Sequence, residues 1–493
     1  MSEKKKSLYI VRGNCYKKLQ SSKENIFDSL VTDPPYGLND NFDIKEVLRY
    51  WLYDMEYRSD KGGFMSKDWD GFVPSPSDWK SIYRVLKPGA YGVVFAGRKT
   101  QDLMTISLRL AGFEIKNVIM WIFGSGFPKS QDTAKALDGV LGSQSTGFSF
   151  AGDDGRKAEL KQNKMLNSAS GYRYEPVSEE AKKWDGYGTD IKPAYEPIIL
   201  IQKPISEGTI ADNIRKWGCG AINIDGCRIG MSEEDKVILD KKSSKNPTNN
   251  YSSNPDKIYG KFGVDAASPA HNLGRFPADI ILDEFTGEIL DQQSGVSRSS
   301  GGKGDTSGLL SNPNVYGSFS GENKGESAGG FGDEGGASRF FYKTEYSEDD
   351  CLYIYCPKPS RTEKEKGLDD LESKKVNDGR KADIDNAYQR GVTERKNTHP
   401  TVKPISLMRY LTRLVTPAGG RVLEPYSGSG TTLVSCGFEG FDCVAFDLYS
   451  EYCRIAYHRA KGNLGDSVDI FARGFDLVES KGVNEYMGED KNE

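Results

Sequence analysis

The chain lacks long apolar runs and has few residues suited to a metal site. No stretch reaches the roughly 18 apolar residues that a membrane-spanning helix needs, and the N-terminus MSEKKKSLYI has no signal-peptide core. The 493 residues include three His, and none of the eight Cys forms a Cys-x-x-Cys pair. We therefore expect no metal site, buried reduced cysteines and a cytoplasmic protein.

An excess of positive charge is also missing. Lys and Arg number 66 against 71 Asp and Glu, which gives a net charge of −5. A nucleic-acid groove needs only a local basic surface, so this balance neither indicates nor excludes DNA binding. Glycine is abundant instead, with 55 of 493 residues against an average of about 7%. This surplus indicates long loops, which are common sites of recognition.

Short apolar runs alternate with helical patterns in the first two hundred residues. Five runs are typical of buried parallel strands: Leu8–Arg12, Phe27–Thr32, Tyr91–Ala96, Lys116–Phe123 and Glu196–Gln202. Helical patterns cover Asp78–Leu86 and Thr100–Ala111. Such alternation predicts an open α/β sheet.

The pattern stops at about residue 205 and resumes after Pro404. The stretch between is polar and turn-rich, and Gly and Ser are dense from 294 to 336. It keeps three apolar islands, at Ile222–Ile224, Ile280–Leu282 and Cys351–Tyr355. We expect an elaborated second region with a flexible segment. Beyond it the sequence predicts helices over Ser406–Val415 and Thr431–Cys436 and strands over Arg421–Glu424 and Cys443–Phe446.

Asp33-Pro34-Pro35-Tyr36 directly follows one predicted strand. The plain interpretation is a proline turn that closes the strand. The chemical interpretation is that the Asp33 carboxylate and the Pro34 carbonyl accept the two N–H bonds of an aromatic amino group, which localises the nitrogen lone pair. Two prolines stiffen the loop, and Tyr36 offers a flat face on which an extruded base can stack.

A second motif, VLEPYSGSGTT, covers residues 422–432. A strand, a glycine-rich turn and a helix start follow in order. Gly428 and Gly430 let a ligand approach the backbone closely at the carboxyl end of the strand. Asp447 ends the next predicted strand, at a distance suited to ribose hydroxyls. A phosphate-binding P-loop is disfavoured because no Lys follows Gly430.

Together, these motifs resemble the amino-methylating DNA methyltransferases of the permuted beta arrangement. In that family the Asp-Pro-Pro-Tyr motif lies near the N-terminus and the cofactor loop near the C-terminus, as here. HPTVKP at 399–404 matches a further cofactor-side motif, and WIFGSGFPKS at 121–130 and KPAYEPIIL at 192–200 are similar to phage-type and prophage-type members. The resemblance covers residues 1–204 and 397–461.

The resemblance implies a Rossmann-like, mostly parallel sheet of seven strands, circularly permuted, with a large inserted target-recognition region. Leu8–Arg12 would be the edge strand. Residues 1–204 would form the catalytic half with a long loop at 124–193. Residues 205–396 would form the target-recognition region, 397–475 the cofactor-binding half, and 476–493 an acidic tail.

The resemblance also assigns site residues. The catalytic residues would be Asp33, Pro34, Pro35 and Tyr36. Those binding S-adenosylmethionine would be Asn14, Cys15, Asp33, Lys403, Glu424, Pro425, Tyr426, Ser427, Gly428, Ser429, Gly430, Thr431 and Asp447. Asn14 stands where Asp is usual, and its carbonyl would accept the adenine amino group of the cofactor. Glu424 and Tyr426 replace a common Asp and Phe.

Double-stranded DNA is the expected partner. Candidate contacts are Arg215, Lys216, Arg228, Arg275 and Arg339, with Lys129, Lys135, Arg156, Lys157, Arg173 and Trp184 in the long loop. Each of the first five taken singly is more readily interpreted as an ordinary surface charge, and the long loop is equally interpretable as a solvated loop. Tyr195 either lines the base pocket or packs in the sheet. A homodimer is possible, and the sequence leaves open both the recognition site and a companion restriction nuclease.

The expected activity is methyl transfer to N6 of a flipped-out adenine. The alternative is N4 of cytosine, because many such enzymes carry Ser in place of Asp33 but others carry Asp. Cytosine C5 chemistry is disfavoured since it needs a nucleophilic Cys and no Pro-Cys pair occurs. An RNA or protein-amide methyltransferase and an inactive DNA-binding module are the remaining alternatives.

Overall fold

The computed structural model describes residues 5–37, 42–55, 57, 71–124, 130–143, 148–150, 172–229, 275–298, 334–344, 359–376 and 393–474. Several sequence-based expectations therefore lie outside the described residues. These are most of the Gly/Ser-rich segment, the island Cys351–Tyr355, the acidic tail, Lys129, Arg156 and Lys157, and the side chain of Arg173.

The described residues form a ten-stranded sheet in the order β11-β8-β4-β7-β3-β2-β14-β15-β1-β16. The strands are β1 (Lys6–Arg12), β2 (Phe27–Thr32), β3 (Leu86–Phe95), β4 (Glu114–Ile122), β7 (Tyr195–Gln202), β8 (Ile280–Asp283), β11 (Tyr342–Thr344), β14 (Arg421–Glu424), β15 (Asp442–Asp447) and β16 (Val468–Arg473). All neighbours pair in parallel except β7, which is antiparallel to β3 and β4. The expected open, mostly parallel α/β sheet is confirmed.

The direction of β7 corrects the expectation that Glu196–Gln202 is a parallel strand. The chain leaves β4 at one edge of the sheet and, after residues 123–194, enters β7 at the same edge, since Ile122 pairs with Tyr195. Such a return to the same edge produces an antiparallel neighbour.

The sheet is larger than the seven strands expected. β16 pairs with β1 in parallel from Lys6 opposite Val468 to Val11 opposite Arg473, so the expectation that Leu8–Arg12 is the edge strand is wrong. At the other side, β8 pairs with β4 and β11 pairs with β8. Both strands come from residues 205–396, so part of that region continues the sheet.

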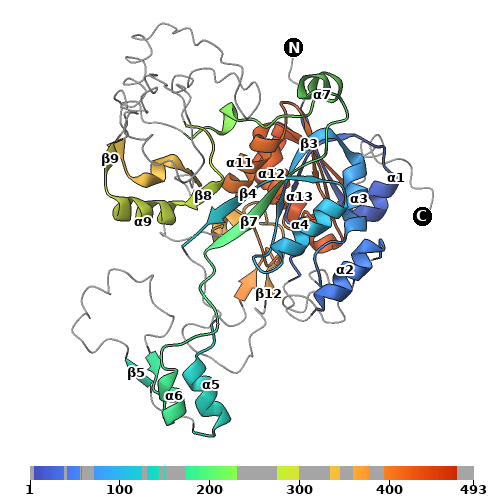
Figure 1. Ribbon diagram of the computed structural model, residues 1–493. Helices are drawn as coiled ribbons and strands as arrows, with labels where there is room; N and C mark the ends of the chain where they lie inside the picture. The colour runs from blue at the N-terminus through green and yellow to red at the C-terminus, as the bar shows by residue number, and fades with distance from the viewer. Residues whose placement is uncertain are drawn as a thin grey trace, which may run out of the picture.

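Helices cover both faces of the sheet (Figure 1). One face carries α1 (Cys15–Ser21), α3 (Pro76–Val85) and α4 (Gln101–Leu110), and a buried cluster includes Leu19, Trp79 and Leu103. The other face carries α11 (Ile405–Val415), α12 (Thr431–Glu439) and α13 (Ser450–Leu464), and a second cluster includes Leu407, Val434 and Ala456. The protein is therefore a three-layer α/β/α structure with a core on each face of the sheet.

The sequence places α3 nearly correctly. The helix begins two residues before the predicted start, because Ser75 and Asp78 form a capping box and Pro76 occupies the first turn. Leu86, predicted as its last residue, already belongs to β3.

The other described elements outside the connection between β4 and β7 are α2 (Ile44–Leu52), α7 (Ile210–Trp217), η4 (Asp225–Cys227), α9 (Glu284–Ser294), β9 (Ser297–Arg298), β10 (Glu334–Gly335), η6 (Ala337–Phe340), α10 (Arg361–Glu365), β12 (Lys374–Val376), β13 (Thr393–Arg395) and η8 (Gly465–Ser467).

The long connection between β4 and β7 contains secondary structure. It holds α5 (Thr133–Val140), the hairpin β5 (Phe148–Phe150) and β6 (Tyr172–Tyr174), and α6 (Glu179–Lys183), set apart from the sheet in Figure 1. The buried carboxylate of Asp138 accepts hydrogen bonds from the Tyr174 hydroxyl and from two backbone N–H groups. Burial alone would raise the pKa of Asp138, but these hydrogen bonds outweigh the effect of burial, and the pKa is lowered to about 2. The Asp138 carboxylate therefore links α5 to the start of α6.

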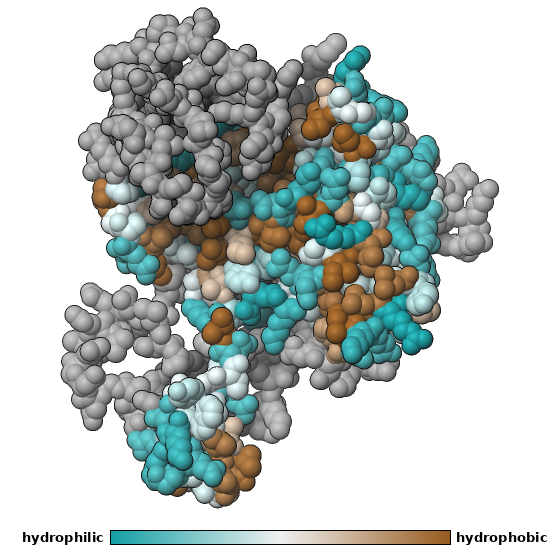
Figure 2. All heavy atoms as spheres, in the orientation of Figure 1, coloured by the Kyte–Doolittle hydropathy of each residue, from teal (hydrophilic) through white to brown (hydrophobic). Residues whose placement is uncertain are grey.

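Figure 2 shows a hydrophobic area at the far end of this connection. Among the apolar side chains of the connection, Val140 is 85% exposed. Whether the connection contacts DNA or closes over a base stays a prediction. Within the described part of the chain, no helix is long and apolar enough to cross a membrane.

The fold predicts that two tryptophans contribute very differently to the free energy of unfolding. Trp79 on α3 is fully buried, whereas Trp184 beside α6 is 48% exposed. We expect Trp79→Ala to lower the free energy of unfolding by about 3–5 kcal/mol because it leaves a cavity. Trp184→Ala should cost less than about 1 kcal/mol. Chemical denaturation of both variants measures this, and equal losses would contradict the proposed core.

Candidate active site

The two sequence motifs meet at the carboxyl edge of the sheet. β2 and β14 are neighbours, with Ser29 opposite Val422 and Leu30 opposite Leu423. Asp33 therefore leaves the sheet next to the glycine-rich loop that follows Glu424. Both border a cavity of about 470 Å³. Parallel pairing thus joins segments nearly four hundred residues apart in the sequence.

The cavity collects almost every residue that the sequence assigns to the site. Its lining includes Asp33, Pro34, Pro35, Tyr36, Asn14, Cys15, Lys403, Glu424, Pro425, Tyr426, Ser427, Gly428, Ser429, Thr431 and Asp447. Gly430 is absent from the lining. It is the N-cap of α12 with φ +79°, and a Cβ there would lie 2.6 Å from Ala456 Cβ. Gly430 therefore allows α12 and α13 to pack closely behind the loop.

Glycine is required at position 428 for two reasons. Its φ is +50°, and a Cβ would lie 2.7 Å from His399 Nε2. Because the His399 Nδ1 lies 2.7 Å from the Thr401 carbonyl, Nδ1 is the donor, and Nε2 faces Gly428. Burial lowers the pKa of His399 to about 4, against the effect of this hydrogen bond. His399 thus packs against the loop as a neutral ring.

Arg459 supports the loop from behind, a role that no motif in the sequence predicts. It is fully buried on α13, and its Nη1 donates to Ser429 O at 2.8 Å, Ser429 Oγ at 3.1 Å and Thr431 Oγ1 at 3.0 Å. Desolvation lowers the pKa of Arg459 to about 10, so it remains a cation at neutral pH. No motif surrounds Arg459, and only the packing of α13 on α12 reveals its role.

Glu424 is buried beneath the loop. Its carboxylate accepts hydrogen bonds from Thr32 Oγ1 at 2.6 Å, Thr432 Oγ1 at 2.6 Å and Tyr426 N at 3.0 Å. Desolvation nevertheless dominates and raises the pKa of Glu424 to about 8. Glu424 therefore links β2, β14 and α12, and its burial favours the protonated form.

Asp447 lies where the sequence predicts, at the end of β15. It accepts from Gly428 N at 3.0 Å and Tyr449 N at 2.9 Å. Desolvation raises the pKa of Asp447 to about 7, against the effect of these hydrogen bonds. The carboxylate faces the same cavity as the loop, which suits a ligand with vicinal hydroxyls.

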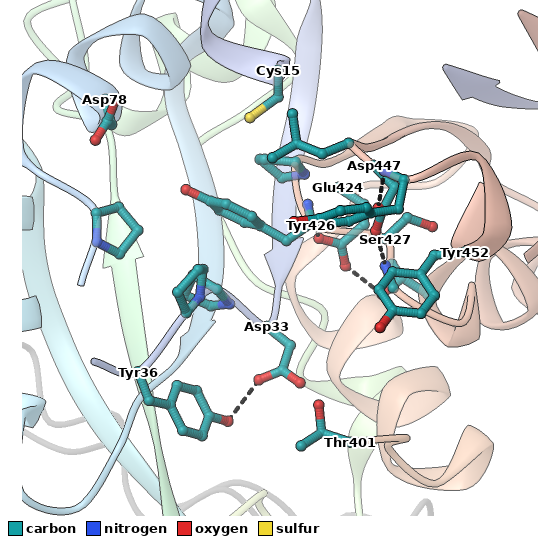
Figure 3. A pocket seen from close by; sticks show the side chains of 18 of the residues that line it. Cys15, Asp33, Tyr36, Asp78, Thr401, Glu424, Tyr426, Ser427, Asp447 and Tyr452 are labelled. Atoms are coloured by element: carbon teal, nitrogen blue, oxygen red, sulfur yellow. Dashed lines mark hydrogen bonds between the residues drawn. The ribbon is translucent and has the colours of Figure 1, made fainter. Parts of the chain in front are cut away.

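Asp33 and Tyr36 lie at the opposite end of the cavity from Cys15 (Figure 3), and Lys403 contacts both of them. The Tyr36 hydroxyl donates to Asp33 Oδ1 at 2.6 Å, and Lys403 Nζ donates to Asp33 Oδ2 at 2.6 Å and to the Tyr36 hydroxyl oxygen at 3.1 Å. Thr100 Oγ1 donates to Tyr36 O at 2.5 Å and so fixes the motif to α4. Asp33 is thus held by two donors on a stiff loop.

Lys403 was expected on the cofactor, but here its ammonium contacts Asp33. It also lies 3.4 Å from Glu196 Oε2 and 4.8 Å from the centre of the Phe95 ring. Burial alone would lower the pKa of Lys403, but the charges of Asp33 and Glu196 outweigh the effect of burial, so the pKa is raised. Glu196 was not assigned by the sequence, although it lies inside the string KPAYEPIIL. Neighbouring Tyr195 begins β7 and is absent from the cavity lining.

Four candidate DNA contacts that the structure describes, Lys216, Arg228, Arg275 and Arg339, are absent from the cavity lining. Lys216 on α7 pairs with Glu207 at 2.7 Å, and α7 packs near Pro88, at the amino end of β3 and thus at the edge opposite Asp33. Arg228 pairs with Asp225 at 2.8 Å. Arg275 is buried against Phe340, and Arg339 donates to the carbonyl of Gly336 at 2.7 Å. These side chains therefore have structural partners within the protein.

The cavity fits S-adenosylmethionine, the cofactor that the motifs imply. Ser427 Oγ is buried and has no hydrogen-bond partner among the described residues, which leaves a donor available to a carboxylate. The glycine-rich backbone approaches the same space, and Asp447 borders it. Ser427, Gly428 and Asp447 would hold the methionine part and the ribose.

Residues 27–458 match the family model described as DNA methylase, that of the N6 and N4 amino-methylating enzymes. The match covers most of the chain, so the chain belongs to this family of DNA methyltransferases.

Individual relatives are distant. The type II methyltransferase M.HindIII of Haemophilus influenzae is 28% identical over 143 residues, which cover 29% of this chain and 35% of that protein. The matched part thus spans about a third of that relative.

Two solved structures are similar over most of the chain. M1.HpyAVI in complex with SAM has a TM-score of 0.33 and 10% identity, covering 92% of this chain and 98% of that one.

The cytosine-N4-specific PvuII DNA methyltransferase has a TM-score of 0.36 and 12% identity, covering 93% of this chain and 89% of that one. With scores this low, neither likeness indicates which base this chain methylates.

The raised pKa of Glu424 predicts a pH-dependent stability. The folded state keeps a proton that the unfolded state loses above about pH 4.3. This contribution is therefore complete at low pH and is lost as the pH rises through 8, at up to about 1.4 kcal/mol per pH unit. Glu424→Gln cannot titrate, so the stability of the wild type should fall relative to this variant between pH 5 and 8. Denaturant titrations across that range measure this, and parallel curves would contradict the assignment.

Proposed function

We propose that this chain transfers a methyl group from S-adenosylmethionine to the exocyclic N6 of adenine in double-stranded DNA, with the base flipped into the cavity. The observation that carries the proposal is the position of Asp33. Its carboxylate is fixed by Tyr36 and Lys403 at one end of a cavity whose other walls fit the cofactor. Asp rather than Ser at this position supports adenine over cytosine.

S-adenosylmethionine supplies a methyl group activated by the sulfonium centre. The protein must position an amino nitrogen in line with it. Each carboxylate oxygen of Asp33 carries two lone pairs, so it can accept an amino N–H while keeping the contact with Tyr36 or Lys403. The Pro34 carbonyl is the second acceptor. As the new bond forms, positive charge develops on the nitrogen, and the Asp33 carboxylate stabilises that charge and takes the proton.

Lys403 and Glu196 are positioning residues in this proposal. Lys403 is 7% exposed, and its ammonium bridges two carboxylates, those of Asp33 and Glu196. Without the cation the carboxylates would repel each other across the site. Glu196 in turn draws part of the ammonium charge away from Asp33, which leaves Asp33 a stronger acceptor for the amino group.

N4 of cytosine is the second candidate. The same two acceptors serve either exocyclic amino group, and the family includes enzymes for both. The two proposals therefore differ in the base and share the chemistry.

Nucleoside mass spectrometry tests the base directly. We expect DNA from cells that express the protein to contain N6-methyladenine, and Asp33→Ala to remove the mark, with a rate loss of about 10³-fold or more. Binding of S-adenosylhomocysteine by the purified variant is the control for folding. N4-methylcytosine would overturn the choice of base. An unmarked genome, with ligand binding intact, would overturn DNA as the substrate.

The contacts of Lys403 with Asp33 and Glu196 predict that removing either Lys403 or Glu196 lowers the rate of methyl transfer, and by different amounts. Glu196→Gln should lower the single-turnover rate on unmethylated genomic DNA about tenfold, and Lys403→Met about a hundredfold, while the affinity for S-adenosylhomocysteine changes little. The reason is that both residues act through Asp33. Lys80→Met removes an exposed ion pair with Asp54 and is the matched control, with no change expected. A loss of ligand affinity equal to the loss of rate would instead place Lys403 on the cofactor.

A further inference from the structure

Asn14 has a structural role at the start of α1. It is the N-cap of α1, and its side-chain oxygen accepts a hydrogen bond from Lys17 N at 3.1 Å. An N-cap contact of this kind stabilises a helix start and fixes the side chain. The amide oxygen that would accept the cofactor's adenine amino group is therefore shared with the backbone of α1, and it carries no charge.

The adenine end of the cavity can be located from the sheet. β1 lies beside β15, with Arg12 opposite Asp447, and Gly13 N donates to Asp447 O at 2.8 Å. A nucleoside whose ribose is at Asp447 thus extends its base toward Gly13, Asn14 and Cys15. These three residues line the cavity.

A carboxylate from another helix borders the same end. Asp78 lines the cavity together with Cys15, and the two lie at the end away from Asp33 and Tyr36 in Figure 3. Burial and the charge of Asp78 raise the pKa of the Cys15 thiol well above its usual value, which reflects how near the carboxylate is. Asp78 belongs to α3, which packs on α1.

The carboxylate of Asp78 is held in place. Its Oδ2 accepts from Ser75 N at 2.9 Å and from Ser75 Oγ at 2.8 Å, as part of the capping box of α3. Flat apolar side chains line the cavity nearby in sequence and space, among them Tyr16, Phe72 and Pro74. A fixed carboxylate between apolar walls is suited to an aromatic ring that carries an amino group.

We propose that Asp78, rather than Asn14, accepts the hydrogen bond from the exocyclic amino group of the cofactor's adenine. The proposal rests on the assignment of S-adenosylmethionine to this cavity. It gives α3 a role in binding, because the residue that caps the helix also recognises the base. The negative charge absent at position 14 is then supplied from a neighbouring helix.

Calorimetry with two ligands tests the assignment. S-adenosylhomocysteine carries the amino group, and S-inosylhomocysteine carries a carbonyl oxygen in its place. We expect the wild type to prefer the adenosyl ligand about tenfold or more, because the carbonyl oxygen would face the Asp78 carboxylate. Asp78→Asn should reduce that preference to about threefold or less, since an amide can donate to the carbonyl.

Two control variants separate recognition from folding. Ser75→Ala removes the hydroxyl from the same capping box but keeps the carboxylate, so the ligand preference should remain that of the wild type. Asn14→Ala removes the cap of α1 and should also leave the preference unchanged. A wild-type preference in Asp78→Asn, or its loss in Asn14→Ala, would overturn the proposal. A wild type that binds neither ligand would overturn the cofactor assignment, and this inference with it.

Discussion

The parallel pairing of β2 with β14 is the constraint on which the site depends. Each strand ends in a motif that carries chemistry, and the pairing of Leu30 with Leu423 sets the two motifs at one level of the sheet. Glu424 strengthens this junction, since its carboxylate joins hydroxyls from β2 and α12. A shift of one residue in this register would turn every side chain of the strand to the opposite face. The strand pairing therefore fixes the position of Asp33 relative to the glycine-rich loop.

The site also depends on buried charges that each have several partners. Arg459 and Lys403 are both nearly inaccessible, and each makes several contacts with oxygen atoms. Taking such ions out of water costs free energy, which partners of good geometry offset. The gain is specificity: these cations fix the glycine-rich loop and Asp33 before any ligand arrives. Preorganised groups of this kind stabilise developing charge more effectively than groups that must rearrange.

The sequence predicted those features that depend on short stretches of chain. Asp33, Tyr36 and Asp447 follow directly after apolar strands, so strand and motif together placed them correctly at one edge of the sheet. β16 was missed because its residues, VDIFAR, include two charges and form no continuous apolar run. The direction of β7 depends on where the long connection returns. Arg459, Glu196 and Asp78 were missed because only packing between elements shows where those side chains point. For Lys403 the motif predicted a position beside the cofactor cavity but did not predict its contact with Asp33.

The order of the strands along the chain sets a problem for biosynthesis. Thr32 and Glu424 touch across 392 positions of sequence, and ribosomes add about 5–20 residues per second. The edge of β2 that will receive β14 therefore stays without its partner for about 20–80 seconds while the rest of the chain is made. An unpaired apolar strand edge in a nascent chain can pair with another chain. Slow synthesis, or a stall before residue 421, would thus expose the centre of the future sheet, and chaperones that shield strand edges would matter most in that interval.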